Sequence, residues 1–118
     1  MAGLEVELDI LPVHPESAAA EVLFRVCQEA LTNIARHAGA RRVIITLGPA
    51  DDGWRLIVDD DGRGFAPGAG EVGAGLGLVG ARERVEQAGG YLDLENRPPV
   101  PGGTPGGARV LVWLPADA

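Results

Sequence analysis

The polar residues best suited to chemistry in this sequence recur every fourth position within residues 28–38. This segment is expected to form a helix, and residues four apart on a helix lie about 40° apart around the axis and one turn along it. Glu29, Asn33 and His37 then form one polar stripe. A carboxylate and an amide oxygen one turn apart can hold a hard cation such as Mg²⁺. The same stripe also suits a solvated helix face with side-chain pairs at four-residue spacing.

The opposite side of this helix is apolar. Arg25 lies one turn before the polar stripe and Arg36 beside it, whereas the core side carries Leu23, Cys27, Ala30, Leu31, Ile34 and Ala38. The helix therefore has a core face and a chemical face. Pro15 fits its first turn, and Gly39 is a typical C-terminal stop.

A second polar group follows a short strand expected over residues 54–58. There Asp59, Asp60 and Asp61 precede Gly62 and Gly64. A buried carboxylate at a strand end can accept a charge-assisted hydrogen bond from an exocyclic amine, and Asp60 suits the amino group of adenine. The two glycines let a flat ring approach the backbone. A tight Asp-Gly turn with solvated carboxylates is the alternative interpretation.

A third group is glycine-rich and opens a helix expected over residues 76–88. Gly73, Gly75 and Gly77 offer backbone N–H groups at the positive end of the helix dipole, a generic phosphate cradle. A flexible loop before a loosely capped helix is the alternative. Gly75, Gly77 and Gly80 also match a dinucleotide-binding spacing. That fingerprint must directly follow a strand, and residues 66–74 do not resemble one.

Five strands and two helices are expected to position these groups. The strands are predicted at residues 4–10, 43–47, 54–58, 91–94 and 108–114, the helices at 15–38 and 76–88, and a Pro/Gly turn region at 96–107. The first strand alternates apolar and polar residues, as a half-buried strand does. The order favours one α+β domain over residues 1–118, a two-layer sandwich with helices packed on one face of a mixed sheet.

The composition argues against several classes of function. The 118 residues carry a net charge of −7, which disfavours nucleic acid or an anionic membrane surface as a partner. Cys27 is the single cysteine, so a reduced, buried thiol in a cytoplasmic protein is expected. No apolar run approaches the roughly 18 residues that a membrane span needs, and the N-terminus has no signal-peptide pattern.

Four segments, in this order, closely resemble the ATP-binding domain of sensor histidine kinases, which has the Bergerat fold and belongs to the superfamily that includes DNA gyrase and MutL. Residues 25–38 resemble the N box, 60–64 the G1 box, 73–77 the G2 box and 106–110 a G3-like element, with a short lid at 65–75. The sequence of the N box and that of residues 80–85 resemble the corresponding segments of the nitrate-sensor and thermosensor branch. The resemblance implies a magnesium-dependent ATP:protein-histidine phosphotransferase.

This resemblance implies a role for each matching residue. Asp60 would bind the adenine amine, with Gly62 and Gly64 lining the base pocket. Asn33 would hold Mg²⁺, and Glu29 would lie near the γ-phosphate to orient or deprotonate the acceptor. The residues that would face the phosphates or shape the cradle and the lid hinge are Arg36, His37, Gly73, Gly75, Leu76 and Gly77.

Two positions depart from the family pattern. Ala108 stands where the fourth box usually has threonine, and Ala74 stands where this branch often has histidine. This chain therefore lacks one hydroxyl that the family has near the adenine pocket and one side chain that would contact the lid or the phosphates.

The resemblance also implies partners. In sensor kinases the phosphorylated histidine lies on a dimerising helical hairpin N-terminal to this domain, and a response regulator is involved indirectly. His14 precedes Pro15 and does not resemble a phosphoacceptor, so this chain is expected to bind Mg-ATP without phosphorylating itself, as an excised domain or a stand-alone relative. The remaining alternatives are an anti-sigma-factor-type serine kinase, a gyrase-type ATPase acting alone and a degenerate nucleotide-binding module.

Overall fold

The structure, a computed structural model, describes residues 4–11, 17–65, 78–97, 101 and 106–116 of the chain. Within them the elements follow one another as β1 (Glu5–Ile10), α1 (Ser17–Asn33), η1 (Ile34–Ala38), β2 (Arg42–Ala50), β3 (Gly53–Asp60), α2 (Leu78–Gln87), β4 (Tyr91–Arg97) and β5 (Gly107–Pro115).

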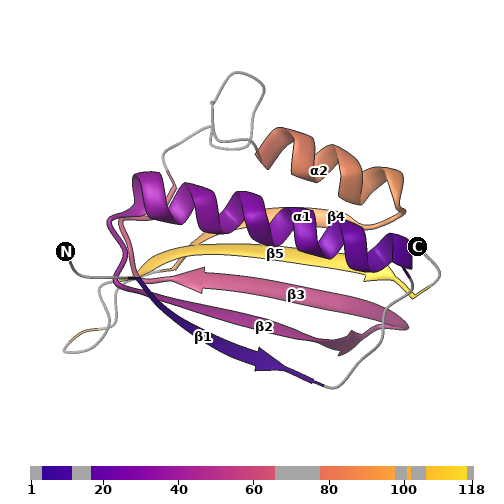
Figure 1. Cartoon of the computed structure of the whole chain (residues 1–118), viewed down its shortest axis with the longest axis horizontal. Coiled ribbons are helices and arrows are strands. Elements are labelled where there is room, and N and C mark those ends of the chain that lie inside the picture. Colours follow the sequence, from indigo (N-terminus) through magenta and orange to yellow (C-terminus); the bar gives the residue numbers. More distant parts are fainter. Residues whose placement is uncertain (1–3, 12–16, 66–77, 98–100, 102–105, 117–118) are drawn as a thin grey trace.

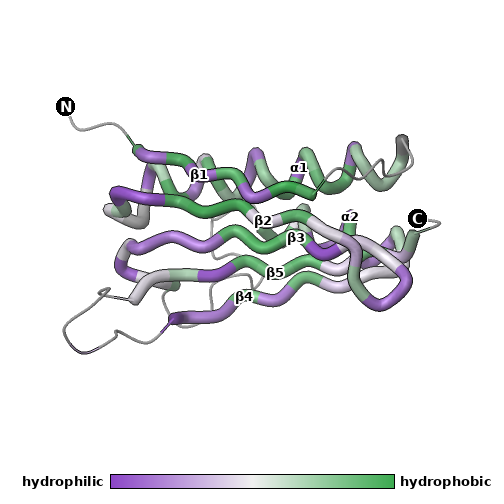
Figure 2. The backbone as a smooth tube through the Cα atoms, turned by 90° about the horizontal axis from the view of Figure 1, so that it is seen from below, coloured by the Kyte–Doolittle hydropathy of each residue, from purple (hydrophilic) through white to green (hydrophobic). Residues whose placement is uncertain are grey.

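The five strands form one mixed sheet in the order β1-β2-β3-β5-β4. β1 runs parallel to β2, and the other neighbours are antiparallel. Figure 1 shows α1 and α2 over one face of this sheet, and Figure 2 shows the strands side by side on the other face. This arrangement confirms the predicted α+β sandwich with helices on one face.

The core fills the space between the helices and the sheet. Alternate residues of the central strands point toward the helices, as the two-residue period of a strand requires. They meet the apolar stripe of α1 and the first two turns of α2. The buried members of this core include Leu23, Val26, Ala30, Val43, Ile45, Leu56, Val58, Leu78, Val85, Val110, Val112 and Leu114.

Two predicted chain reversals are confirmed. Gly39, with φ 63° and ψ 23°, ends the first helical segment in the left-handed conformation that suits glycine. Asp51 and Asp52 link β2 to β3 with φ values of 51° and 60°. Positive φ at both central residues is the geometry that matches the twist of a two-residue hairpin.

The structure corrects the prediction of a half-buried first strand. Val6, Leu8 and Ile10 are 46%, 63% and 49% exposed. Their register with Val43 and Ile45 places them on the helix side of the sheet, but β1 is an edge strand that the helices leave uncovered. The alternating pattern identified a strand correctly, whereas burial depends on a neighbour that the pattern does not specify.

The interpretation of residues 96–107 as a turn region is also corrected. β4 continues to Arg97, so Asn96 and Arg97 lie in the strand and pair with Ala108 and Gly107. Asn96 follows Leu92 and Leu94 at the two-residue period of a strand. This spacing could have identified the extension from the sequence.

The single cysteine is a packing residue. Cys27 lies on the core side of α1 and packs against the buried cluster. Burial raises the pKa of its thiol, which disfavours the reactive thiolate. No helix among the described residues is long and apolar enough to cross a bilayer.

Candidate functional site

Three consecutive aspartates at the end of β3 have different surroundings. On the open face of the sheet, the one opposite the helices, the carboxylate of Asp59 accepts hydrogen bonds from Nε and Nη2 of Arg109 at 2.7 and 3.2 Å. Asp61 turns toward the start of β2 and accepts the N–H groups of Arg41 and Arg42 at 2.8 and 3.0 Å. Burial opposes ionisation of Asp61, but the N–H groups of Arg42 and Arg41, with its own N–H and the positive charge of Arg41, outweigh burial and hold its pKa below the usual range.

Asp60 is the one buried charged side chain among the residues that the structure describes, with 3% of its surface exposed. Its Oδ1 accepts the N–H of Gly62 at 2.7 Å, and the backbone N–H of Ala108 donates to the same carboxyl group. Burial raises the pKa of Asp60, and the two hydrogen bonds offset only part of that effect. The solvated-turn interpretation is therefore wrong for this residue, which is a desolvated hydrogen-bond acceptor.

β5 approaches Asp60 so closely that only glycine fits at its first position. A Cβ on Gly107 would collide with the carbonyl oxygen of Asp60, and its φ of 137° is one that L side chains rarely adopt. The next residue, Ala108, is 4% exposed and bonds Asp60 through its backbone. Ala108 thus lacks the threonine hydroxyl of the family pattern but keeps a direct contact with the carboxylate.

Two residues of β4 hold the loop that follows Asp60. Nη1 of Arg97 donates to the carbonyl oxygen of Asp60 at 3.3 Å. Oδ1 of Asn96 accepts the N–H of Phe65 at 2.6 Å, and Nδ2 of Asn96 donates to the carbonyl oxygen of Phe65 at 3.1 Å. Sequence reasoning missed both residues because it placed them in a turn.

The helical half of the predicted site is less enclosed. Glu29 is exposed on α1, and Nδ2 of Asn33 is buried without a hydrogen-bond partner in the described part of the chain. Because buried amides are normally bonded, the side chain of Asn33 is suited to receive a ligand. α1 and β3 both end on the same side of the molecule in Figure 1, so Asn33 and Asp60 lie at one end of the two layers.

The end of this helical segment differs from the regular geometry assumed from the sequence. Residues Ile34–Ala38 form a π-helix, η1, in which hydrogen bonds span five residues. Glu29 and Asn33 therefore share an α-helical stripe, whereas the regular α-helix expected through His37 is replaced by a π-helix after Asn33. That His37 extends the polar stripe stays a prediction. Arg36 is exposed, and the side chain of His37 lies outside the described residues.

The predicted phosphate cradle also falls outside the described residues. This holds for Gly73, Ala74, Gly75, Leu76 and Gly77 and for residues 66–75 of the predicted lid, whose assignments stay predictions.

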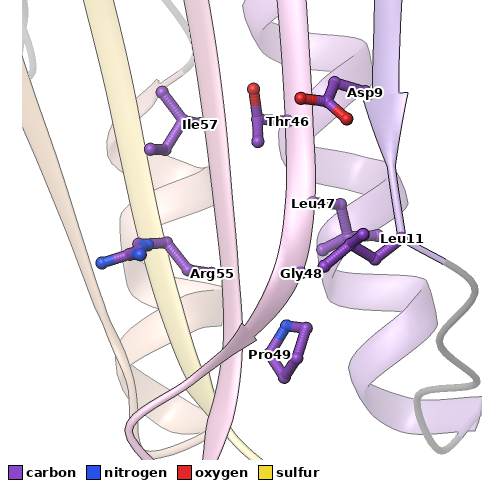
Figure 3. A pocket seen from close by; sticks show the side chains of 8 residues that line it. All are labelled: Asp9, Leu11, Thr46, Leu47, Gly48, Pro49, Arg55 and Ile57. Atoms are coloured by element: carbon purple, nitrogen blue, oxygen red, sulfur yellow. The ribbon is translucent and has the colours of Figure 1, made fainter.

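A hollow of about 230 Å³ lies on the uncovered face of the sheet (Figure 3). Its lining consists of Asp9, Leu11, Thr46, Leu47, Gly48, Pro49, Arg55 and Ile57. The register pairs Thr46 with Ile57, whereas the adjacent Ile45 and Val58 belong to the core under the helices. The hollow shares no residue with the Asp60 end of the sheet and is a separate surface feature.

Comparison with known families agrees with this arrangement. Residues 18–118 match the model of the histidine kinase-, DNA gyrase B- and HSP90-like ATPase family. The sensor histidine kinase NarS of Mycobacterium tuberculosis is 36% identical over 118 residues, which cover 97% of this chain and 26% of the relative. The histidine-protein kinase/phosphatase UhpB of Salmonella typhimurium is 42% identical over 93 residues, covering 79% of this chain and 17% of that protein. The chain thus spans about a sixth to a quarter of these relatives.

Solved structures share the fold. The mycobacterial sensor histidine kinase MprB superposes with a TM-score of 0.71 at 26% identity, covering 95% of this chain and 81% of that one. A blue-light activated histidine kinase of Erythrobacter litoralis gives a TM-score of 0.78 at 22% identity, covering 97% and 36%. The chain therefore belongs to the histidine kinase-, DNA gyrase B- and HSP90-like ATPase family, as an ATP-binding domain of the sensor histidine kinase type.

Proposed function

We propose that this chain is the Mg-ATP-binding catalytic domain of a two-component sensor kinase and that it supplies the γ-phosphate to a histidine on a separate dimerisation domain. The buried carboxylate of Asp60 carries the proposal most directly. It is fixed by two backbone N–H groups and kept out of water, so an entering exocyclic amine would find a preorganised acceptor. Gly62 and Gly64 would line the pocket for the base.

Asn33 and Glu29 would serve the phosphate end of the nucleotide. Mg²⁺ prefers oxygen ligands and often takes only one or two from protein, with phosphates and water supplying the rest. Among the described residues, no group of three His, Cys, Asp or Glu side chains is arranged to hold a metal ion. The amide oxygen of Asn33 would be the Mg²⁺ ligand, while its buried and unpartnered Nδ2 would be free to donate to a phosphate oxygen. A bound ion would neutralise phosphate charge.

Glu29 would orient the acceptor imidazole or take its proton, and Arg36 and His37 would face the phosphates. Phosphoryl transfer depends mainly on positioning and charge neutralisation, and these residue types supply both. The predicted cradle of Gly73, Gly75, Leu76 and Gly77 would add backbone N–H groups.

The proposed partners are the dimerisation and phosphoacceptor domain of the same or another kinase and, indirectly, a response regulator, in the cytoplasm. The curated relatives are named sensor histidine kinases, which supports this assignment over a serine kinase or an ATPase acting alone. With a net charge of −7, the domain would contact neither nucleic acid nor the membrane surface.

Calorimetric titration with ADP and a non-hydrolysable ATP analogue tests the proposal. We expect micromolar to submillimolar binding, and a loss of about 10- to 100-fold in Asp60→Asn because a hydrogen bond to a charged acceptor becomes neutral. No binding at millimolar nucleotide, or equal binding by the variant, would contradict the assignment of Asp60.

A further inference from the structure

The loop after Asp60 spans three strands at the end of the sheet. Asp60 ends β3, and Ala108 of β5 pairs with Asn96 of β4, so these three residues are neighbours across the sheet. The loop leaves β3 and reaches Asn96 at Phe65. A Cβ on Gly64, the residue before Phe65, would lie 3.4 Å from the carbonyl oxygen of Gly107 and 2.7 Å from Oδ1 of Asn96.

The two ends of this loop are held in different ways. At its start, Gly62 bonds the carboxylate of Asp60. At its end, one side chain holds both polar groups of one peptide residue, because Asn96 accepts from Phe65 N–H and donates to Phe65 C=O. A carboxamide carries its donor and its acceptor on two separate atoms, so it can bond the N–H and the C=O of one residue at once. The side chain of Phe65 also packs against the core, which fixes the same point from the other direction.

We propose that Asn96 is a positioning residue of the nucleotide site, whose amide anchors the Gly62–Phe65 loop to β4 and so keeps Gly62 bonded to Asp60. This inference rests on the proposed function, because the loop it anchors is the one that would line the base pocket. Asn96 acts through the loop backbone and not through contact with the nucleotide, since both polar atoms of its side chain are engaged by Phe65.

The geometry predicts distinct consequences for each atom of the amide. Asn96→Ala removes both hydrogen bonds to Phe65. Asn96→Asp retains an acceptor for the Phe65 N–H but places a second carboxylate oxygen against the Phe65 carbonyl, where a donor stood. The matched control is Asp93→Asn, an exposed position on the same strand that pairs with Leu111 on the open face of the sheet.

Amide hydrogen exchange and ADP titration on the 118-residue chain test the proposal, at a temperature well below unfolding. In Asn96→Ala we expect exchange at Phe65 N–H and Gly62 N–H to accelerate at least about 10-fold and ADP to bind about 10-fold more weakly, as two lost hydrogen bonds imply. Asn96→Asp should preserve more of the Phe65 protection than Asn96→Ala. Asp93→Asn should change neither measurement.

The outcomes separate this inference from the proposed function. If the unaltered chain binds no ADP, the proposed function fails, while slow exchange at Phe65 and Gly62 still reports on the anchor. If the unaltered chain binds ADP and both Asn96 variants bind it within twofold, the positioning role is refuted. If Asn96→Ala does not fold, Asn96→Asp decides the matter by the same two readouts, because it differs from asparagine by a single group.

Discussion

The strand end at Asp60 and the helix end at Asn33 lie on the same side of the molecule but are built in opposite ways. At the strand end, the carboxylates of Asp59, Asp60 and Asp61 each have hydrogen-bond donors from the chain itself. At the helix end, Glu29 is exposed and the amide of Asn33 keeps a buried donor without a partner in the described part of the chain. The half proposed for the base is therefore preorganised, whereas the half proposed for the phosphates depends on its ligand for completion.

The largest expected effect comes from breaking the preorganised half at Gly107. Gly107→Ala would drive a methyl group into the carbonyl of Asp60 at a strained φ, which should cost about 3 kcal/mol or more of unfolding free energy. Urea unfolding measures this loss. The control is Gly80→Ala, because a Cβ at Gly80 meets nothing within 4 Å in α2, and alanine should there stabilise the helix by about 0.5–1 kcal/mol. A Gly107 variant as stable as the control would contradict the close approach of β5.

A smaller effect, with opposite signs for binding and stability, follows from the titration of Asp60. Its pKa in the folded state is raised, so its ionisation opposes folding. As the pH falls from neutral through that raised pKa toward the ordinary aspartate value of about 3.9, Asp60 takes up a proton more readily in the folded state than in the unfolded state. The free energy of unfolding should therefore rise. ADP affinity should decline over the same range, because the charged acceptor is lost. Comparing the chain with Asp60→Asn at each pH isolates this residue, because the variant lacks the titrating group. Parallel pH profiles for both proteins would show that Asp60 does not titrate in this window.

On the helical half, Asn33→Ala should leave stability unchanged or raise it by up to about 1 kcal/mol, because the variant removes a buried donor that has no partner among the described residues. Urea unfolding of the nucleotide-free chain measures this difference. A loss of several kcal/mol would mean that the chain satisfies this amide and that the helix end is as preorganised as the strand end.

The smallest expected effect concerns Glu29. Because its side chain is exposed, Glu29→Gln should change the unfolding free energy by no more than about 0.5 kcal/mol and should leave ADP affinity nearly unchanged. The proposed role predicts instead a loss of phosphoryl transfer when a dimerisation domain is supplied in trans with labelled ATP. Equal transfer by the variant would remove Glu29 from the chemistry.

The contrast between the halves also explains which features the sequence could predict. The alternation of apolar and polar residues identified the strands, and the turn-forming residues identified the hairpin turn at Asp51 and Asp52 and the helix end at Gly39. These features depend on local backbone geometry. The expectation of a buried carboxylate at the end of a strand is confirmed at Asp60. Its neighbours Asp59 and Asp61 could not be told apart from it, because their partners Arg109 and Arg41 are distant in the sequence.

The errors arose where long-range contacts decide the structure. A regular helix was assumed through His37, but η1 widens the last turn, and no residue type specifies a π-helix. Asn96 was placed in a Pro/Gly turn, whereas pairing with Ala108 keeps it in β4. The exposure of β1 follows from its place at the sheet edge, which strand patterning leaves open.

The most direct test of the two-part account is ADP titration of the chain, Asp60→Asn and Asn33→Ala, each with and without Mg²⁺. If the base half is preorganised and the phosphate half needs the ion, Asp60→Asn should weaken binding by about 10- to 100-fold in both conditions, and Asn33→Ala should abolish only the gain that Mg²⁺ provides. The account is contradicted if Asn33→Ala weakens binding equally without Mg²⁺, or if Asp60→Asn matters only when Mg²⁺ is present.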